Sequence, residues 1–276
     1  MDTVAVLGPV GTFTDEAARR YFGSSKFIYC NSVTEVFDMV ERDVEYGVIP
    51  IENSTEGSVG ETIDCLRKYD LYIWGEVYHH IVHVLAGTGR LEDVKTIMTH
   101  PQAISQCRNK VEKLLKSMPQ VVTKGPTGKV LSTARAMEMV AQEKDPTIAV
   151  IGSKNAAQKY GLNIIAENLS DQDDNETRFF VISKKQHQKT GKDKTSIITA
   201  VKDEAGALWK LLGIFAREGI NLTKIESRPR RERKWEYLFF IDFEGHKDDG
   251  KVENMLESIK ESSTYFKLLG SYPRWA

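Results

Sequence analysis

Three polar clusters stand directly beside apolar runs, where a folded chain could gather them around a ligand. One begins at Gly8 and contains Thr12, one is the run ENST at 52–55, and one is TRF at 177–179. Arginine can hold a carboxylate through two parallel hydrogen bonds, and a threonine hydroxyl can donate one more. Open α/β sheets bind ligands beyond the carboxyl ends of their strands, where the second cluster falls. These residue types favour a site for a small anionic molecule.

Each cluster also has a purely structural interpretation. Thr12 is placed to cap the helix that follows, with Asp15 three residues later as in a capping box. A turn rich in capping residues explains 52–55 equally well, and a surface arginine paired with one of the nearby acids explains Arg178. The glycines around Thr12 have neither the dinucleotide-binding nor the P-loop spacing, so the loop has no nucleotide fingerprint.

The composition narrows the classes of function. The 276 residues include 38 basic and 39 acidic side chains, and this net charge of −1 argues against a dedicated nucleic-acid binder. No apolar run reaches the roughly 18 residues of a membrane span, and the N-terminus does not resemble a signal or transit peptide. Three scattered cysteines predict neither a disulfide framework nor a zinc site, and the histidines at 79, 80 and 83 are not spaced as metal ligands. We expect a cytoplasmic protein without a metal.

The chain divides into two parts of different pattern. Up to residue 183, apolar runs alternate with helical periodicity, which predicts an α/β domain with largely parallel sheets. A lysine-rich stretch at 184–194 is expected to be a solvated linker, the alternative being a contact with an anionic surface. From 195 to 276 the order is β-α-β-β-α-β, a ferredoxin-like unit. Its first helix has a predicted buried face at Leu208, Leu211, Leu212 and Phe215.

The small domain has features of a binding module for an amino acid. Gly206 and Ala207 open its first helix, where a ligand or a partner chain can approach closely. Asn221 and Arg228 could hold the charged ends of an amino acid. The basic run RPRRERK at 228–234 is expected to be a solvated hairpin turn, with nucleic-acid binding as the alternative.

Several stretches, taken in order, resemble the prephenate dehydratases that carry a C-terminal ACT domain. They are GPVGTFTDEAA, YGVIPIENSTEGSV, THPQAISQC, STARAM, AVIGSKNAAQKYGL, NETRFFVI, GALWKLLGIF, NLTKIESRP and LGSYP. None is decisive alone, but together they span nearly the whole chain in the order and spacing of the family. No chorismate mutase segment precedes Met1, so the monofunctional form is expected.

The resemblance implies a fold and a reaction. The fold is α/β, with a two-lobed catalytic domain similar to periplasmic binding proteins over 1–183, whose second lobe covers about 79–160, and an ACT domain over 195–276. The reaction is the decarboxylating dehydration of prephenate to phenylpyruvate in phenylalanine biosynthesis, without a cofactor. The alternatives are an arogenate dehydratase, which shares these motifs, and an amino-acid sensor that has lost the chemistry. The intact TRF triplet argues against the sensor.

The resemblance also implies roles for the residues of the catalytic site. Thr177 is associated with the departure of the ring hydroxyl. A threonine hydroxyl is too weak an acid to be the proton source, so we expect Thr177 to be a positioned hydrogen-bond donor. Arg178 is expected to bind a substrate carboxylate, and Phe179 to form an apolar wall for the carboxylate that leaves. The remaining substrate contacts are expected from Thr12, Asn53, Ser54, Ser132 and Thr133.

For regulation, the resemblance implies L-phenylalanine as the effector of the ACT domain. The effector residues are expected to be Gly206, Ala207, Leu208, Asn221, Leu222, Glu226, Ser227, Arg228 and Pro229. In the family this pocket lies between the ACT domains of two subunits, so a homodimer or homotetramer is expected. The family includes inhibited and activated members, and we expect inhibition here.

Overall fold

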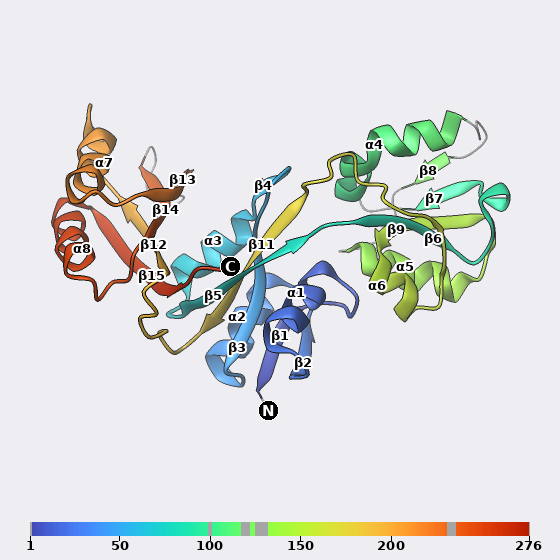
Figure 1. Ribbon diagram of the computed structural model, residues 1–276, viewed down its shortest axis with the longest axis horizontal. Helices are drawn as coiled ribbons and strands as arrows, with labels where there is room; N and C mark the ends of the chain where they lie inside the picture. Colours follow the sequence, from blue (N-terminus) through green and yellow to red (C-terminus); the bar gives the residue numbers. More distant parts are fainter. Residues whose placement is uncertain (1, 99–100, 117–121, 125–131, 231–235, 276) are drawn as a thin grey trace. The chain divides into compact units, whose positions relative to one another are not determined.

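The computed structural model of the protein describes residues 2–98, 101–116, 122–124, 132–230 and 236–275. The chain forms three β-sheets with helices packed against them (Figure 1). Its internal contacts divide it into two compact units, of which the first contains 1–36, 48–59 and 78–179 and the second contains 37–47, 60–77 and 180–276. No helix in the described ranges is long and apolar enough to cross a membrane.

The first sheet has six strands in the order β2-β1-β3-β11-β5, with the short β4 paired to β3. The strands are β1 (Thr3–Leu7), β2 (Lys26–Cys30), β3 (Tyr46–Asn53), β4 (Gly57–Ser58), β5 (Tyr72–His80) and β11 (Glu176–Ser183). The helices that connect them are α1 (Phe13–Phe22), α2 (Val33–Arg42) and α3 (Gly60–Lys68). β1 and β2 are parallel, as the alternating pattern predicts. The order makes β3 and β11 neighbours although they are far apart in sequence.

The second sheet has five strands in the order β10-β6-β9-β7-β8. The strands are β6 (His83–Gly87), β7 (Thr96–Met98), β8 (Val122–Lys124), β9 (Ile148–Ser153) and β10 (Asn163–Ala166). The single-turn 3-10 helix Leu91–Asp93 precedes β7. β7 is parallel to β8 and β9, whereas β6 is antiparallel to both of its neighbours. The prediction of a largely parallel sheet is therefore confirmed, with β6, through which the chain enters this sheet, as the exception.

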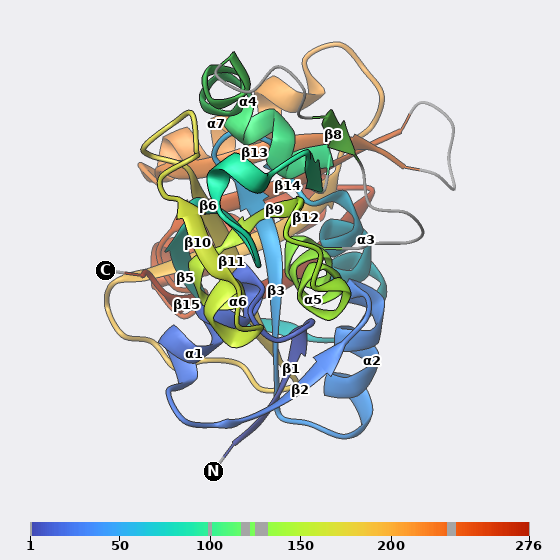
Figure 2. The same cartoon turned by 90° about the vertical axis from the view of Figure 1, so that its right-hand side faces the viewer.

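Helices cover both faces of the second sheet. They are α4 (Pro101–Lys116), α5 (Thr133–Glu143) and α6 (Lys154–Lys159). Successive residues of a strand point to opposite faces, so Val150 packs with Met137 of α5 while Ile151 packs with Cys107 of α4. Figure 1 and Figure 2 place α4 on one side of these strands and α5 and α6 on the other.

The third sheet is antiparallel, in the order β13-β14-β12-β15. Its elements are β12 (Asp193–Ala200), α7 (Ala207–Glu218), β13 (Leu222–Pro229), β14 (Tyr237–Glu244), α8 (Gly250–Ser262) and β15 (Tyr265–Pro273). The predicted β-α-β-β-α-β order is confirmed. Of the four positions predicted for the buried face of α7, Leu211 and Phe215 are buried and Leu212 is half-buried, whereas Leu208 is 38% exposed. The helix instead buries Ala207, Leu211, Ile214 and Phe215.

The lysine-rich stretch is exposed over most of its length but is held at several points. Lys185 forms an ion pair with Glu45, and Lys189 forms one with Asp249. Lys194 is buried at the start of β12, where its ammonium lies 3.0 Å from a carboxylate oxygen of the equally buried Glu76. The stretch is therefore not solvated throughout, because at its end a buried charge is paired within the second unit.

Candidate active site

The candidate site forms where the end of β3 meets the start of β11. The backbone N–H of Ser54 donates to the carbonyl of Glu176 at 2.9 Å, and the N–H of Glu176 donates to Ser54 Oγ at 3.0 Å. Ser54 also donates to the carbonyl of Asp174. The Ser54 hydroxyl therefore fastens the two segments that contain Asn53 and Thr177.

The direction of the hydrogen bond between Asn53 and Thr177 follows from the backbone. Asn53 Oδ1 accepts from the backbone N–H groups of Thr55 and Glu56, at 3.0 and 3.1 Å. A backbone N–H can only donate, so the other end of the Asn53 amide is its NH₂ group. This group donates to Thr177 Oγ1 at 2.9 Å. Because Thr177 Oγ1 is the acceptor there, the Thr177 hydroxyl proton remains for a ligand.

The network continues into the second sheet's helix α4. Asn53 Nδ2 also donates to Asn175 Oδ1 at 2.7 Å, which leaves the NH₂ group of buried Asn175 to donate to Gln106 Oε1 at 3.2 Å. The same Gln106 oxygen lies 2.9 Å from His83 Nε2. Five side chains from four segments thus form one chain of hydrogen bonds that ends at Thr177.

Glu52 and Arg178 form a second pair on the opposite face of the same two strands. Adjacent residues of a strand point to opposite faces, so Glu52 points away from Asn53, and Arg178 away from Thr177. Arg178 is 2% exposed and donates from Nη1 to Glu52 Oε1 at 3.2 Å. Its guanidinium also lies over the ring of Tyr78, 5.8 Å from the centroid. The predicted binding of a substrate carboxylate by Arg178 stays a prediction, and in the structure this side chain is paired with Glu52.

Thr12 caps α1, as predicted. Its hydroxyl accepts from the N–H of Asp15 at 3.2 Å and donates to the carbonyl of Leu7 at 3.1 Å. The capping box differs from the expected form, because the Asp15 carboxylate accepts from Gly11 N–H instead of from the cap residue itself. Gly11 has a φ of +86°, and a Cβ there would lie 2.9 Å from the backbone of Ala156, so the approach of this loop to α6 requires glycine.

The other predicted substrate contacts lie at different distances from this network. Phe179 shares the face of Thr177 on β11 and is buried. Ser132 is the N-cap of α5 and accepts from the N–H of Arg135, while Thr133 packs against Gly152. Within the described ranges, no hydrogen bond joins Ser132 or Thr133 to Thr177. Their contact with a substrate stays a prediction.

Sequence reasoning missed Gln106, Asn175 and His83. Gln106 lies within THPQAISQC and Asn175 within NETRFFVI, whereas His83 lies outside every stretch that carries the resemblance. No local spacing connects any of the three with Thr177. Burial lowers the pKa of His83, with hydrogen bonds to Gln106 and to the backbone of Gly152 acting in the opposite direction. Burial also raises the pKa of the Cys107 thiol to about 12, so this neighbour of Gln106 is no thiolate nucleophile at neutral pH.

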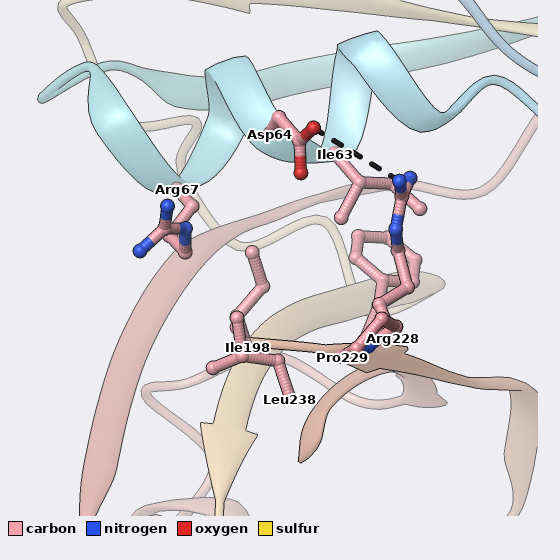
Figure 3. A pocket seen from close by; sticks show the side chains of 8 residues that line it. Ile63, Asp64, Arg67, Ile198, Arg228, Pro229 and Leu238 are labelled. Atoms are coloured by element: carbon pink, nitrogen blue, oxygen red, sulfur yellow. Dashed lines mark ion pairs between the residues drawn. The ribbon is translucent and has the colours of Figure 1, made fainter. Parts of the chain in front are cut away.

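The predicted effector residues lie in the third sheet and at the start of α7. Along β13 the alternating residues Leu222, Glu226 and Arg228 are half-buried, while Ser227 and Pro229 are exposed. Figure 3 shows Arg228 and Pro229 in a small pocket with Ile63, Asp64, Arg67, Ile198, Leu238 and Phe240. Arg228 Nη2 lies 3.9 Å from Asp64 Oδ2, on α3. Its guanidinium is also so close to Gly60 that a Cβ there would lie 2.4 Å from it.

Within one chain, the predicted effector residues occupy opposite ends of the sheet. Asn221 comes directly before β13, and its carbonyl accepts from the N–H of Glu244. Glu244 pairs with Lys194 near the start of β12, so Asn221 lies at that end of the sheet. Gly206 follows the other end of β12 and begins α7 with a φ of +83°. The structure therefore does not bring Gly206 and Asn221 together in a single subunit.

A family model described as prephenate dehydratase matches residues 4–187, which contain every residue of the Thr177 network. The chain belongs to the prephenate dehydratase family. A model described as ACT domain matches residues 195–261. The resemblance and the enzyme class, a hydro-lyase family, are thereby confirmed.

Relatives in the prephenate dehydratase family align with almost the whole chain. The bifunctional chorismate mutase/prephenate dehydratase of Aquifex aeolicus is 44% identical over 98% of this chain and 73% of its own length. The prephenate dehydratase of Methanocaldococcus jannaschii is 42% identical over 96% of both chains. Arogenate dehydratase/prephenate dehydratase 2 of Arabidopsis thaliana is 36% identical over 98% of this chain and 72% of its own.

Two solved structures are similar over 90% or more of their length. Prephenate dehydratase from Arthrobacter aurescens, in complex with L-Phe, is 34% identical with a TM-score of 0.88, covering 99% of this chain and 90% of that one. A protein described as GqqA, a novel type of quorum quenching acylase, is 27% identical with a TM-score of 0.87, covering 99% and 98%. Both carry the same overall fold.

Proposed function

We propose that the chain catalyses the decarboxylating dehydration of prephenate. The C–C bond to the ring carboxylate breaks, its electron pair enters the ring, and the C–O bond to the ring hydroxyl breaks. The products are phenylpyruvate, carbon dioxide and, after the hydroxide takes up a proton, water. The observation that carries the proposal is the hydrogen-bond network ending at Thr177, within a family of this activity.

Aromatisation drives this reaction, so the protein has to orient the substrate and stabilise the departing oxygen. Thr177 suits the second task, because Asn53 already donates to its oxygen and its own proton is left to donate. A donor fixed before the reaction needs no reorganisation as charge develops on the leaving oxygen. The proton that completes water comes from a stronger acid than Thr177, or from solvent.

The remaining roles belong to the same proposal. Asn53 holds Thr177, Ser54 holds the loop that presents Asn53, and Phe179 supplies an apolar wall near the carboxylate that leaves. Arg178 binds a substrate carboxylate only if its ion pair with Glu52 breaks and the substrate takes the place of the Glu52 carboxylate. Further contacts to the substrate come from Thr12, Ser132 and Thr133.

We also propose that L-phenylalanine binds the ACT domain and inhibits the enzyme. The described relative from Arthrobacter aurescens, in complex with L-Phe, supports the ligand. Because Gly206 and Asn221 lie at opposite ends of one sheet, a pocket containing both requires two chains, as a homodimer or homotetramer would supply. The exposure of Trp209 (77%), Leu208 and Ile225 in this domain supports such pairing. The proposed domains are 1–183, with a second lobe at about 79–160, and 195–276, joined by 184–194.

The first experiment follows phenylpyruvate, by its absorbance in alkali, in reactions of the purified protein with prephenate. Turnover that falls when phenylalanine is added supports both the reaction and the regulation. Arogenate is assayed beside prephenate, and faster turnover of arogenate would replace the proposed substrate. Folded protein that binds phenylalanine but turns over neither compound would be an amino-acid sensor instead.

A further inference from the structure

His83 ends the hydrogen-bond network opposite Thr177, and its proton can be assigned. Gln106 Oε1 is an acceptor, because it already accepts from the NH₂ group of Asn175 at 3.2 Å. His83 Nε2, at 2.9 Å from the same oxygen, must therefore donate. The imidazole consequently carries its proton on Nε2.

The surroundings of His83 favour the neutral ring and hold it in place. The side chain is buried, and Nδ1 makes no hydrogen bond among the described residues, although the backbone of Gly152 acts to raise the pKa of the ring. A second proton would place a charge in this buried environment, and burial is the larger influence on the pKa of the ring. Phe13 packs edge-on against the ring, with centroids 5.3 Å apart and planes at 81°, and Ser170 Oγ accepts from the His83 backbone N–H at 3.2 Å.

The two donors to Gln106 Oε1 fix which way the Gln106 amide faces. With its oxygen held by His83 and Asn175, the NH₂ group of Gln106 is turned away from both. If His83 did not donate, the hydrogen bond from Asn175 would be the one side-chain hydrogen bond to Gln106 left among the described residues. A rotated amide would place its NH₂ group against that of Asn175. The hydrogen-bond chain would then break between Gln106 and Asn175. Asn175 is the partner of Asn53, whose amide holds Thr177.

We propose that His83 is a positioning residue for the dehydration, acting through Gln106, Asn175 and Asn53 on the hydroxyl of Thr177. It touches no substrate and exchanges no proton during the reaction. The inference rests on the proposed function and adds to it a requirement for a buried N–H donor at His83 Nε2. Such a donor need not be a histidine, which provides the test.

The test compares His83→Gln with His83→Phe. Glutamine can place an N–H donor near the position of Nε2, whereas phenylalanine keeps the ring and loses the donor. We expect His83→Phe to lower kcat about 10- to 100-fold with little change in KM, since small misplacement of catalytic groups has effects of this size. His83→Gln should stay within about threefold of the wild type. His79→Phe is the matched control, because His79 also lies beside Phe13 but pairs with Glu16, outside the network.

The outcomes separate this inference from the proposed function. Wild-type protein without prephenate turnover overturns both. With an active wild type, equal losses in His83→Gln and His83→Phe indicate a packing role and overturn the inference alone, as does normal kcat in His83→Phe. Nitrogen-15 NMR of the imidazole gives a readout independent of activity. A neutral ring protonated on Nε2 supports the inference, and protonation on Nδ1 or on both nitrogens overturns it.

Discussion

Asn53 donates a hydrogen bond to Thr177 across 2.9 Å, although 124 positions separate the two residues in the sequence. The bond has a fixed direction, because the backbone N–H groups of Thr55 and Glu56 occupy Asn53 Oδ1. This direction leaves the Thr177 proton available to a ligand, which in the proposed function is the departing hydroxyl of the substrate, and the main predictions depend on it.

Asn53→Asp should reverse the direction of this bond. An aspartate can still accept from the N–H groups of Thr55 and Glu56, but it has no proton to give to Thr177. The Thr177 hydroxyl would then donate to the carboxylate, and we expect kcat to fall about 100-fold. Initial rates with prephenate measure this, with Asn254→Asp on the exposed face of α8 as the matched control. Near-normal kcat in folded Asn53→Asp would contradict the assigned direction.

Arg178→Gln should destabilise the fold. Arg178 is buried and its partner Glu52 is partly exposed. Removing the guanidinium therefore leaves the Glu52 carboxylate without its ion-pair partner and only partly hydrated, which destabilises the folded state. We expect the free energy of unfolding to fall by about 2 kcal/mol, less than for a fully buried pair. Urea unfolding measures it, and Glu52→Gln combined with Arg178→Gln should recover part of the loss. Unchanged stability with a large rise in KM would instead assign Arg178 to substrate binding.

Arg228→Ala should weaken the response to phenylalanine without abolishing catalysis. Arg228 lies in the ACT domain, and its guanidinium is 3.9 Å from Asp64 of α3, outside that domain, and close to Gly60 at the start of α3. We expect the phenylalanine concentration for half of the effect to rise about tenfold, as for the loss of one charged contact. Arg217→Ala, on the exposed side of α7, is the control. An unchanged response in Arg228→Ala would place the effector site elsewhere.

The stability of the fold should depend on pH through His83. Burial lowers its pKa below the ordinary 6.5, so below pH 6.5 the unfolded chain binds a proton that the native chain does not. This contribution to stability is present above pH 6.5 and is lost as the pH falls toward the native pKa. Unfolding free energies at about pH 7.5 and pH 5.5 should therefore differ less in His83→Gln than in the wild type. An equal difference in the two proteins would contradict a depressed pKa.

Local patterns were sufficient to predict most of the fold. The helical spacing of Val252, Met255, Leu256 and Ile259 predicts the buried face of α8, on which Leu256 is half-buried and the other three are buried. The same spacing failed at Leu208 in α7, because an exposed apolar face and a buried one have the same period. Strand alternation is enough to place the side chains of Arg178 and Thr177 on different faces of β11, since adjacent residues of a strand point to opposite faces.

The candidate site was harder to predict, because its parts meet only in three dimensions. Asn53 and Thr177 stand out because each ends or begins a strand in a polar cluster. Gln106 lies within helix α4, where a glutamine is an ordinary residue, and only the packing of α4 brings it to Asn175. The direction of each hydrogen bond depends on backbone N–H groups that a sequence does not place.

The role of the Thr177 hydroxyl is tested by prephenate turnover of Thr177→Ala, measured beside the wild type and Thr177→Ser. We expect wild-type protein to form phenylpyruvate, Thr177→Ala to lose at least about 100-fold in kcat, and Thr177→Ser, which keeps a hydroxyl, to retain most of it. Phenylalanine binding, measured by calorimetry, should be unchanged in all three. Normal turnover by folded Thr177→Ala would contradict the central claim that the Thr177 hydroxyl assists the departing oxygen.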